Sequence, residues 1–398
     1  MRLAVVSPFV DRRHGTERAV AELLERLARK EHCEIHLYSQ RVEGLALTES
    51  AVPQPQESGA IVWHKVPSIP GPHLLQFLFW LFLNSLRRAW DRWMNGLRFD
   101  LVLSPGINCL DADVVIVHVL FHRVRELARE EGIETTQPGF LRGFHRRAYY
   151  SLLARLERRI YTNRKVSLAA VSRRTATLLS NYFQRPDVCV IPNGVDTAQF
   201  SASARLAMRT QTRRRRNFQD SDFVLLLIGN DWCVKGLGTV LKAMNTLREL
   251  PIHVIAAGDD SPDPFNGMAK SLGISERCHF ESSREDVLDF YAAADLYVSP
   301  SREDSFGLPV AEAMACGLPV ITSGFAGVAD FIQTGENGFV LPDPHDSQKL
   351  AQLLGELIRD PERRQRIGEA ASKVAAVWNW DRNAEGVFEL LGNAAARK

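Results

Sequence analysis

Short apolar runs alternate with longer amphipathic segments along most of the chain. A run of four to six aliphatic residues predicts a buried strand, and apolar positions three or four apart predict a helix packed on a sheet. Residues 16–30, for example, repeat leucine, alanine and valine at helical spacing after a first apolar run. Alternation of this kind is typical of strand–helix units on a parallel sheet. The predicted strands are 2–7, 34–38, 61–66, 100–103, 113–118, 167–171 and 188–191, then 223–228, 253–257, 278–281, 296–299, 319–322 and 338–341.

The alternation is interrupted once, over residues 201–222, where the sequence is polar and has no clear period. We interpret this stretch as a linker or surface loop, and the length of 398 residues also favours more than one domain. The predicted fold class is α/β, with two doubly wound Rossmann-like domains facing a cleft. The predicted domains are an N-terminal, acceptor-binding domain over 1–200, a C-terminal, nucleotide-sugar-binding domain over 201–375, and a helix over 376–398 that packs back on the first domain.

Composition adds an uneven charge to this picture. The chain is 45% hydrophobic and 24% charged, which excludes a disordered or collagen-like protein. Residues 1–200 hold 27 lysines and arginines against 20 acidic residues, whereas the remainder carries an excess of acidic residues. The first half is therefore expected to meet something anionic, such as a membrane surface or an acidic acceptor. The six cysteines show no CxxC and no Cys/His cluster, which favours reduced thiols over a disulfide scaffold or a zinc module.

The segment 300–317 carries the clearest candidate chemistry, because it follows a predicted strand and opens a predicted helix. Gly307 and Pro309 suit a helix start, so the preceding backbone amides would form an anion site. Asp304 and Glu312 flank this turn, and carboxylates accept hydrogen bonds from sugar hydroxyls. The structural alternative is that Asp304 caps the helix and Glu312 pairs with a nearby base.

This segment resembles the Glu-seven-residues-Glu motif of retaining glycosyltransferases of family 4, which have the GT-B fold. Asp304 stands at the first acidic position and Glu312 at the second. The resemblance covers residues 165–345 strongly and the first 160 weakly. Further segments match the family in the same order: 190–196 with Phe200, 227–229 with 235–236, 256–258, 293–295 and 334–338.

The resemblance implies a role for each matching residue. Glu312 would bind the ribose of a nucleotide-sugar donor, Asp304 would bind the sugar, and Lys235 would neutralise the diphosphate. Asn230 departs from the family, since many relatives carry an arginine there as a second phosphate cation. The implied donor-binding residues are Gly15, Gly229, Asn230, Lys235, Asp304, Phe306, Gly307, Leu308 and Glu312, and the implied catalytic residues are His118, Lys235 and Asp304.

The first half offers weaker matches. Residues 12–18 resemble the glycine-rich loop of the family, but only Gly15 is carried over. Arg12, Arg13 and Arg18 are candidates to compensate for Asn230. His118 ends a predicted strand, where the family often has a residue that reaches toward the transferred sugar; a buried, hydrogen-bonded histidine is the alternative. His122 is a second candidate. The chain has no GxGxxG, which disfavours a nicotinamide-dependent oxidoreductase.

The resemblance implies a retaining, metal-independent hexosyltransferase without a cofactor. Residues 229–236 are similar to the same segment of lipopolysaccharide-core glucosyltransferases, which suggests UDP-glucose as donor and a hydroxyl of a lipid-linked, lipopolysaccharide or polysaccharide acceptor. The alternatives are a nucleotide-sugar epimerase or hydrolase, and a non-catalytic nucleotide-sugar-binding protein. The Asp-X-Asp triplets at 111–113 and 220–222 are about as frequent as chance supplies, so no metal is expected.

Two basic and aromatic stretches bear on the membrane. The apolar run 74–83 is shorter than the roughly 20 residues that a spanning helix needs, and arginines and tryptophans follow it. Residues 137–165 combine arginines with aromatic residues. Such helices suit an anionic lipid interface. We therefore expect a cytoplasmic protein that contacts the inner face of the cytoplasmic membrane peripherally. No nucleic acid partner is expected. The alternative is that run 74–83 forms a buried core helix with an ordinary solvated face.

Overall fold

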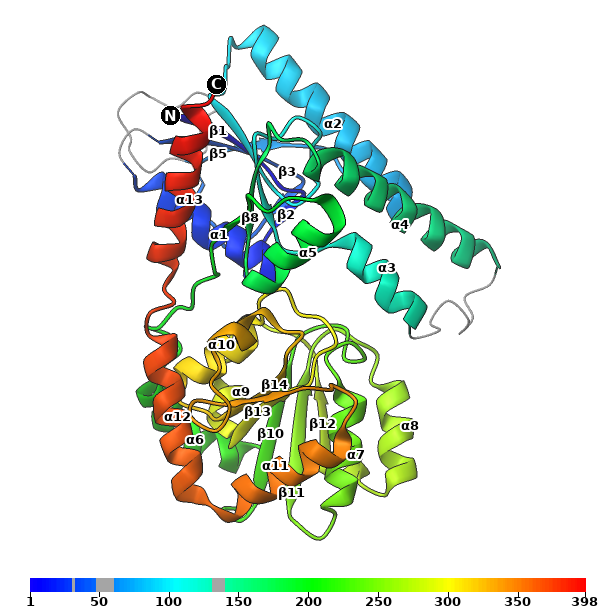
Figure 1. The fold of residues 1–398 in the computed structure, drawn as a ribbon, viewed down its shortest axis with the longest axis vertical. Helices are drawn as coiled ribbons and strands as arrows, with labels where there is room; N and C mark the ends of the chain where they lie inside the picture. Colours follow the sequence, from blue (N-terminus) through cyan, green and yellow to red (C-terminus); the bar gives the residue numbers. More distant parts are fainter. Residues whose placement is uncertain (31–32, 48–60, 131–139) are drawn as a thin grey trace. The chain divides into compact units, whose positions relative to one another are not determined.

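The computed structural model describes residues 1–30, 33–47, 61–130 and 140–398. Within it the chain divides into two compact units (Figure 1). Unit 1 comprises Met1–Pro192 together with Trp380–Lys398, and unit 2 comprises Asn193–Asn379. Each unit is described by itself.

Unit 1 is a parallel sheet covered by helices. Its strands are β1 (Arg2–Val6), β2 (Phe9–Val10), β3 (Glu34–Ser39), β4 (Arg41–Val42), β5 (Ile61–Lys65), β6 (Leu101–Pro105), β7 (Val114–Val117), β8 (Ser167–Ala170) and β9 (Cys189–Val190). Seven of them form one sheet in the order β5-β3-β1-β6-β7-β8-β9, and β2 pairs with β4. Because helices cover both faces, the central strands are continuous apolar runs. The helices are α1 (Gly15–Ala28), α2 (His73–Met94), α3 (Phe121–Glu130), α4 (Phe140–Tyr161), α5 (Arg173–Phe183) and α13 (Trp380–Ala395).

Unit 2 has a six-stranded parallel sheet in the order β12-β11-β10-β13-β14-β15, in which the first strand lies in the middle. Its strands are β10 (Phe223–Ile228), β11 (Ile252–Ala257), β12 (Cys278–Glu281), β13 (Leu296–Ser299), β14 (Val320–Ser323) and β15 (Phe339–Leu341). This is the order of nucleotide-binding doubly wound sheets, which place ligands beyond the carboxyl ends of the strands. The helices are α6 (Ala202–Arg215), α7 (Leu237–Thr246), α8 (Asp263–Leu272), α9 (Leu288–Ala293), α10 (Leu308–Ala315), α11 (Ser347–Arg359) and α12 (Pro361–Ala375).

The α/β class and the two Rossmann-like sheets are confirmed, but the predicted loop over 201–222 is wrong. Most of that stretch is helix α6, which packs on α9. Arg213 is buried and donates to the carbonyls of Ala293, Gln219 and Asp222 and to the Asp295 carboxylate. A helix held by ion pairs lacks an apolar stripe, and so it leaves no periodic signal in the sequence.

Helix α2 is amphipathic, but most of its fully buried residues are polar and its exposed side is apolar. Its fully buried residues are Trp80, Asn84, Arg88 and Asp91, three of which are polar or charged. The opposite side is exposed and apolar. At 3.6 residues per turn, its large apolar residues lie within an arc of about 120° around the helix axis. The alternative that run 74–83 is a buried core helix is therefore wrong. We call the following exposed residues the outer face of α2: Leu75, Leu78, Phe79, Phe82, Leu86, Trp90 and Trp93.

The buried polar residues of α2 are anchored to the rest of unit 1 by hydrogen bonds and ion pairs. Arg88 donates to both carboxylate oxygens of Asp111, at 2.6 and 2.7 Å. The Asp91 Oδ2 atom accepts from the Tyr38 hydroxyl at 2.9 Å and lies 2.9 Å from His64 Nδ1. These contacts fix which side of the helix faces the sheet.

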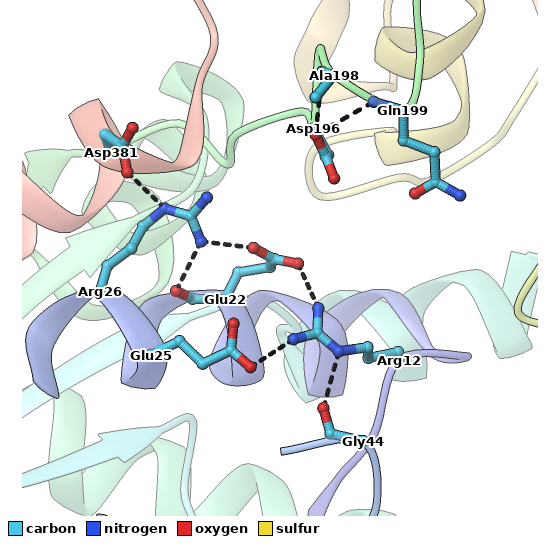
Figure 2. A network of polar contacts seen from close by, with 9 residues as sticks. All are labelled: Arg12, Glu22, Glu25, Arg26, Gly44, Asp196, Ala198, Gln199 and Asp381. Atoms are coloured by element: carbon cyan, nitrogen blue, oxygen red, sulfur yellow. Dashed lines mark hydrogen bonds and ion pairs between the residues drawn. The ribbon is translucent and has the colours of Figure 1, made fainter. Parts of the chain in front are cut away.

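The beginning of unit 1 is joined to its last helix by a chain of ion pairs (Figure 2). Arg12 binds Glu22 and Glu25, each at 2.6 Å, and donates to the Gly44 carbonyl at 2.9 Å. Arg26 then connects Glu22 on α1 to Asp381 on α13, at 2.5 and 2.7 Å. The guanidinium of Arg12 is therefore engaged within unit 1.

Candidate functional site

Two loops of unit 2 meet beyond neighbouring strands. Residues 229–236 follow β10 and residues 300–307 follow β13, and the two strands pair in parallel. The carboxyl ends of parallel neighbours lie at one edge of the sheet, so both loops emerge together. Lys235 Nζ lies 2.5 Å from Asp304 Oδ2, and each side chain is about 15% exposed. Two residues that sequence analysis singled out separately thus form one charged pair at this edge.

Close backbone contact fixes the relation of the two loops. Gly236 starts α7 with a φ of +83°, and a Cβ atom there would lie 2.3 Å from the Pro300 carbonyl oxygen. Gly229 also has a positive φ, +129°, with Lys235 beside it. Only glycine tolerates such a backbone at this distance, so the main chain fixes how closely the two loops approach each other.

The start of α10 has the geometry expected of an anion site. Gly307 has a φ of +92°, and the first helical hydrogen bonds are donated by Val310 and Ala311 to its carbonyl. The amides of Phe306, Gly307 and Leu308 precede that turn, where a helix leaves N–H groups without intrahelical acceptors. The positive end of the helix dipole lies at the same place. A phosphate is the anion that such termini commonly bind.

Glu312 lies within α10 and is buried, at 2% exposure. Its Oε2 atom accepts a hydrogen bond from the Tyr291 hydroxyl at 2.7 Å. Burial and the neighbouring Glu312 carboxylate raise the pKa of Tyr291, so this phenol remains a donor. Burial, and then the carboxylates of Asp304 and Glu312, also raise the pKa of Tyr297.

Asn230 joins the loop after β10 to a third loop, the one after β11. Its Oδ1 atom accepts from the backbone N–H of Asp259 at 2.9 Å, and the next residue but one, Trp232, donates its N–H to Asp260 at 2.8 Å. The loop after β10 is thereby joined to the loop after β11. An amide at position 230 serves this purpose without adding a cation.

The candidates of unit 1 lie at strand and helix ends. Gly15 is the first residue of α1, and His118 directly follows β7 and is buried. His122 Nδ1 lies 2.6 Å from the buried Glu157 carboxylate, which also accepts the backbone N–H groups of Phe121 and His122. Glu157 thus caps α3, and His122 belongs to this structural arrangement rather than to an open site.

Metal ligands do not gather in the part of the chain that the structure describes: no group of three histidine, cysteine, aspartate or glutamate side chains there could hold an ion. The Asp-X-Asp triplets have structural partners. Asp111 binds Arg88, Asp113 accepts from the Val102 N–H at 2.8 Å, and Asp222 accepts from the Gln219 N–H at 2.7 Å. Across the same described residues, no helix is long and apolar enough to cross a membrane.

Sequence analysis missed the two tyrosines beneath the site. Tyr291 lies on α9 and Tyr297 on β13, and both are fully buried, with their rings stacked 6.4 Å apart. Neither belongs to the motif that carries the resemblance. The only available signal was a polar hydroxyl within an otherwise apolar run, which is also common in ordinary cores.

In a comparison with known proteins, each half of the chain matches a glycosyltransferase family model. A family model described as Glycosyltransferase Family 4 matches residues 13–199, and one described as Glycosyl transferases group 1 matches residues 208–374. A D-inositol 3-phosphate glycosyltransferase from Salinispora arenicola is 31% identical over 236 residues, covering 55% of this chain and 52% of that protein. Lipopolysaccharide glucosyltransferase WaaG of Escherichia coli is 32% identical over 145 residues, covering 36% of this chain and 39% of that protein. The chain spans about half the length of the curated relatives it matches first.

Solved structures agree on the fold over the whole chain. A crystal structure of WaaG, a glycosyltransferase involved in lipopolysaccharide biosynthesis, aligns with a TM-score of 0.73 at 22% identity and covers 99% of both chains. HepE of Anabaena, in complex with UDP-glucose, aligns at 0.72 with 18% identity, covering 99% of this chain and 100% of that one. Structural similarity at such low sequence identity shows the fold, whereas the two family models show the family. The chain therefore belongs to the family 4 glycosyltransferases and has the GT-B fold.

Proposed function

We propose that the protein is a retaining glycosyltransferase that moves a hexose from a nucleotide diphosphate sugar to a hydroxyl acceptor. The observation that carries this proposal is the Lys235–Asp304 pair beside the start of α10. An ammonium and a helix N-terminus side by side supply positive charge for a diphosphate, and a carboxylate next to them can accept hydrogen bonds from a sugar.

In the proposed reaction the chain stabilises the leaving group. Lys235 and the amides of Phe306, Gly307 and Leu308 meet the negative charge that develops on the departing diphosphate. Asp304 orients the sugar, and Glu312 accepts hydrogen bonds from the ribose. The acceptor hydroxyl attacks on the face that the diphosphate leaves, and it transfers its proton to that phosphate. His118 and Gly15, on unit 1, complete the proposed set, with His118 directed to the transferred sugar.

For the substrates we favour UDP-glucose and a glycolipid or oligosaccharide acceptor. Support comes from relatives: WaaG is a lipopolysaccharide glucosyltransferase, and HepE has been crystallised with UDP-glucose. The D-inositol 3-phosphate glycosyltransferases indicate that acceptors differ among relatives of similar identity. A binding screen over UDP-, GDP- and ADP-sugars would identify the base first. Product analysis with and without acceptor then separates transfer from epimerisation or hydrolysis.

The proposal includes peripheral contact with an anionic membrane on its cytoplasmic side. Arg147, Arg155, Arg158 and Arg159 of α4 are exposed, while the only acidic residue of that helix, Glu157, is buried. Residues 137–139 of the basic and aromatic stretch, and the side chains of Arg142 and Arg146, lie outside the described residues. An exposed basic helix face favours anionic lipid headgroups.

Replacing Glu312 with glutamine tests the donor assignment. The amide oxygen can still accept from Tyr291, so we expect an unchanged Tm. Loss of the charge should weaken hydrogen bonds to the ribose by about 1.5–3 kcal/mol, or roughly 10- to 150-fold in kcat/KM. Glu362→Gln, at an exposed position of α12, is the matched control and should have full activity. Unchanged melting together with unchanged kcat/KM for Glu312→Gln would remove this residue from the donor site.

Activity is expected to survive EDTA. Lys235 and the loop amides supply the charge that a metal would otherwise provide, and both Asp-X-Asp triplets have structural partners. The measurement is the initial rate after dialysis against EDTA, with and without added Mn²⁺ or Mg²⁺. Complete loss that either ion restores would show that the diphosphate is bound in another way.

A further inference from the structure

Among the residues that the structure describes, the outer face of α2 gathers seven exposed, large apolar side chains that the site does not use. Phe82 and Trp93 are 63% and 76% exposed, and both lie on the same side of the helix as Leu75 and Leu86. Soluble helices ordinarily turn such residues inward. Here the fully buried positions are Trp80 and three polar or charged residues, so the exposure of the apolar side needs a physical reason.

The exposed orientation is built into the fold. Turning the outer face inward would require Arg88 and Asp91 to leave Asp111, Tyr38 and His64, which hold them in a buried setting. Removing one partner of a buried charge pair costs about 3–5 kcal/mol, and this rotation would remove the partners of both Arg88 and Asp91. The helix therefore presents its apolar side outward as a stable state.

The charges of α2 identify the partner. Its only acidic residue, Asp91, faces inward, whereas Arg87 and Arg92 are exposed on the two flanks of the apolar stripe. Helix α4 lies beside α2, where Tyr149 packs against Phe77, and its exposed described charges are all arginines (Figure 1). An apolar stripe flanked by arginines and ending in tryptophans matches the acyl and headgroup layers of an anionic bilayer.

We infer that α2 lies in the plane of an anionic lipid interface, with its outer face in contact with the acyl chains. This inference rests on the proposed membrane contact and deepens it by naming the inserted element. The stripe from Leu75 to Trp93 is about 27 Å long at 1.5 Å per residue, and the helix does not have the composition of a span. A second copy of the chain would have to match arginines on both flanks with acidic groups, which the outer face does not offer.

Tryptophan fluorescence can test the insertion directly. The chain has seven tryptophans, and Trp90 and Trp93 are the two that are largely exposed. On mixing with vesicles of phosphatidylglycerol and phosphatidylcholine, we expect a blue shift of the emission and quenching by brominated acyl chains. Both signals should disappear in W90F/W93F, whose remaining tryptophans are mostly buried. Emission that neither shifts nor is quenched while the wild type sediments with vesicles would overturn the insertion.

A second pair of variants separates the apolar contact from the electrostatic one. F79S/F82S/L86S should weaken vesicle binding by about tenfold or more at low and at high salt, because transfer of apolar surface is not screened. R147Q/R158Q/R159Q should weaken it at low salt only. L206S, at a 57% exposed position of α6, is the matched control and should bind as the wild type does. Equal binding of the α2 variant and the wild type at both salt concentrations would contradict the inference.

Two further measurements complete the test. Binding of UDP-glucose by calorimetry should be the same in F79S/F82S/L86S and in the wild type, so that failure of the donor proposal and failure of the membrane inference can be told apart. Sedimentation equilibrium without lipid should show a monomer in both proteins. A wild-type dimer that the α2 variant abolishes would mean that a second copy covers this face, and would overturn the lipid assignment.

Discussion

Replacing Lys235 with alanine is expected to lower kcat/KM by a factor of about 10²–10³, the usual effect of removing one preorganised donor to a developing negative charge. The ammonium lies 2.5 Å from Asp304 Oδ2, and the next residue, Gly236, packs closely against Pro300. Asn230, at the position where many relatives have arginine, is engaged with the Asp259 N–H. The loss should therefore fall on turnover, measured as the initial rate of transfer from UDP-glucose.

A matched control lies on the helix that follows. Lys242 is exposed on α7, and Lys242→Ala should be fully active. Removing Lys235 also leaves the partly buried Asp304 carboxylate without its counter-charge, so the Tm of Lys235→Ala must be measured beside its activity. A folded Lys235→Ala that retains activity within threefold of the wild type would show that the diphosphate is stabilised elsewhere.

Replacing Arg213 with alanine is expected to lower the free energy of unfolding by about 3–5 kcal/mol, since three backbone carbonyls lose their buried donor, while Asp295 keeps Arg209 as a cation. The guanidinium donates to three backbone carbonyls and, at 3.1 Å, to Asp295, which also accepts the N–H of Val224 on the central strand β10. Its loss would leave these acceptors buried beneath α6. Urea unfolding at neutral pH measures the change.

The neighbouring residue provides the control for this prediction. Arg214 is exposed on the same helix, and Arg214→Ala should change stability by no more than about 0.5 kcal/mol. The two variants remove the same side chain from adjacent positions, so helix propensity and net charge cancel in the comparison. Equal stability of Arg213→Ala and Arg214→Ala would mean that the carbonyls and Asp295 find other donors.

The strands of both sheets were predictable because they are buried on both faces. Residues 223–228 and 296–299 were placed to the residue, since each is a mainly apolar run between polar turns. Residues 278–281 were placed equally well, although Cys-His-Phe-Glu forms a partly buried edge strand. Helix α6 was not, because it is stabilised by arginines whose acceptors lie about 80 residues further along the chain. Strands β2 and β4 were also missed, because each is only two residues long.

The site was predictable in its parts and not in its connections. Gly307 and Pro309 mark a helix start in any sequence, and Lys235 stands out beside a glycine. The contact between Lys235 and Asp304 joins residues 69 positions apart, and only the pairing of β10 with β13 brings them together. Which side of α2 faces outward likewise depends on distant partners such as Asp111, so an apolar run alone could not decide it.

The division of unit 1 into two stretches of sequence has a consequence for biosynthesis. Domains generally fold as units as they leave the ribosome, the N-terminal one first. Here the sheet of unit 1 is translated first, but α13, which packs on α1 and binds Pro192 through Asn383, is translated only after all of unit 2. The nascent chain must therefore carry an incomplete first unit, with the apolar surface that α13 covers still open, while the second unit folds. Unit 2, whose sequence is continuous, is expected to become protease-resistant first, although it follows the sheet of unit 1 in the sequence.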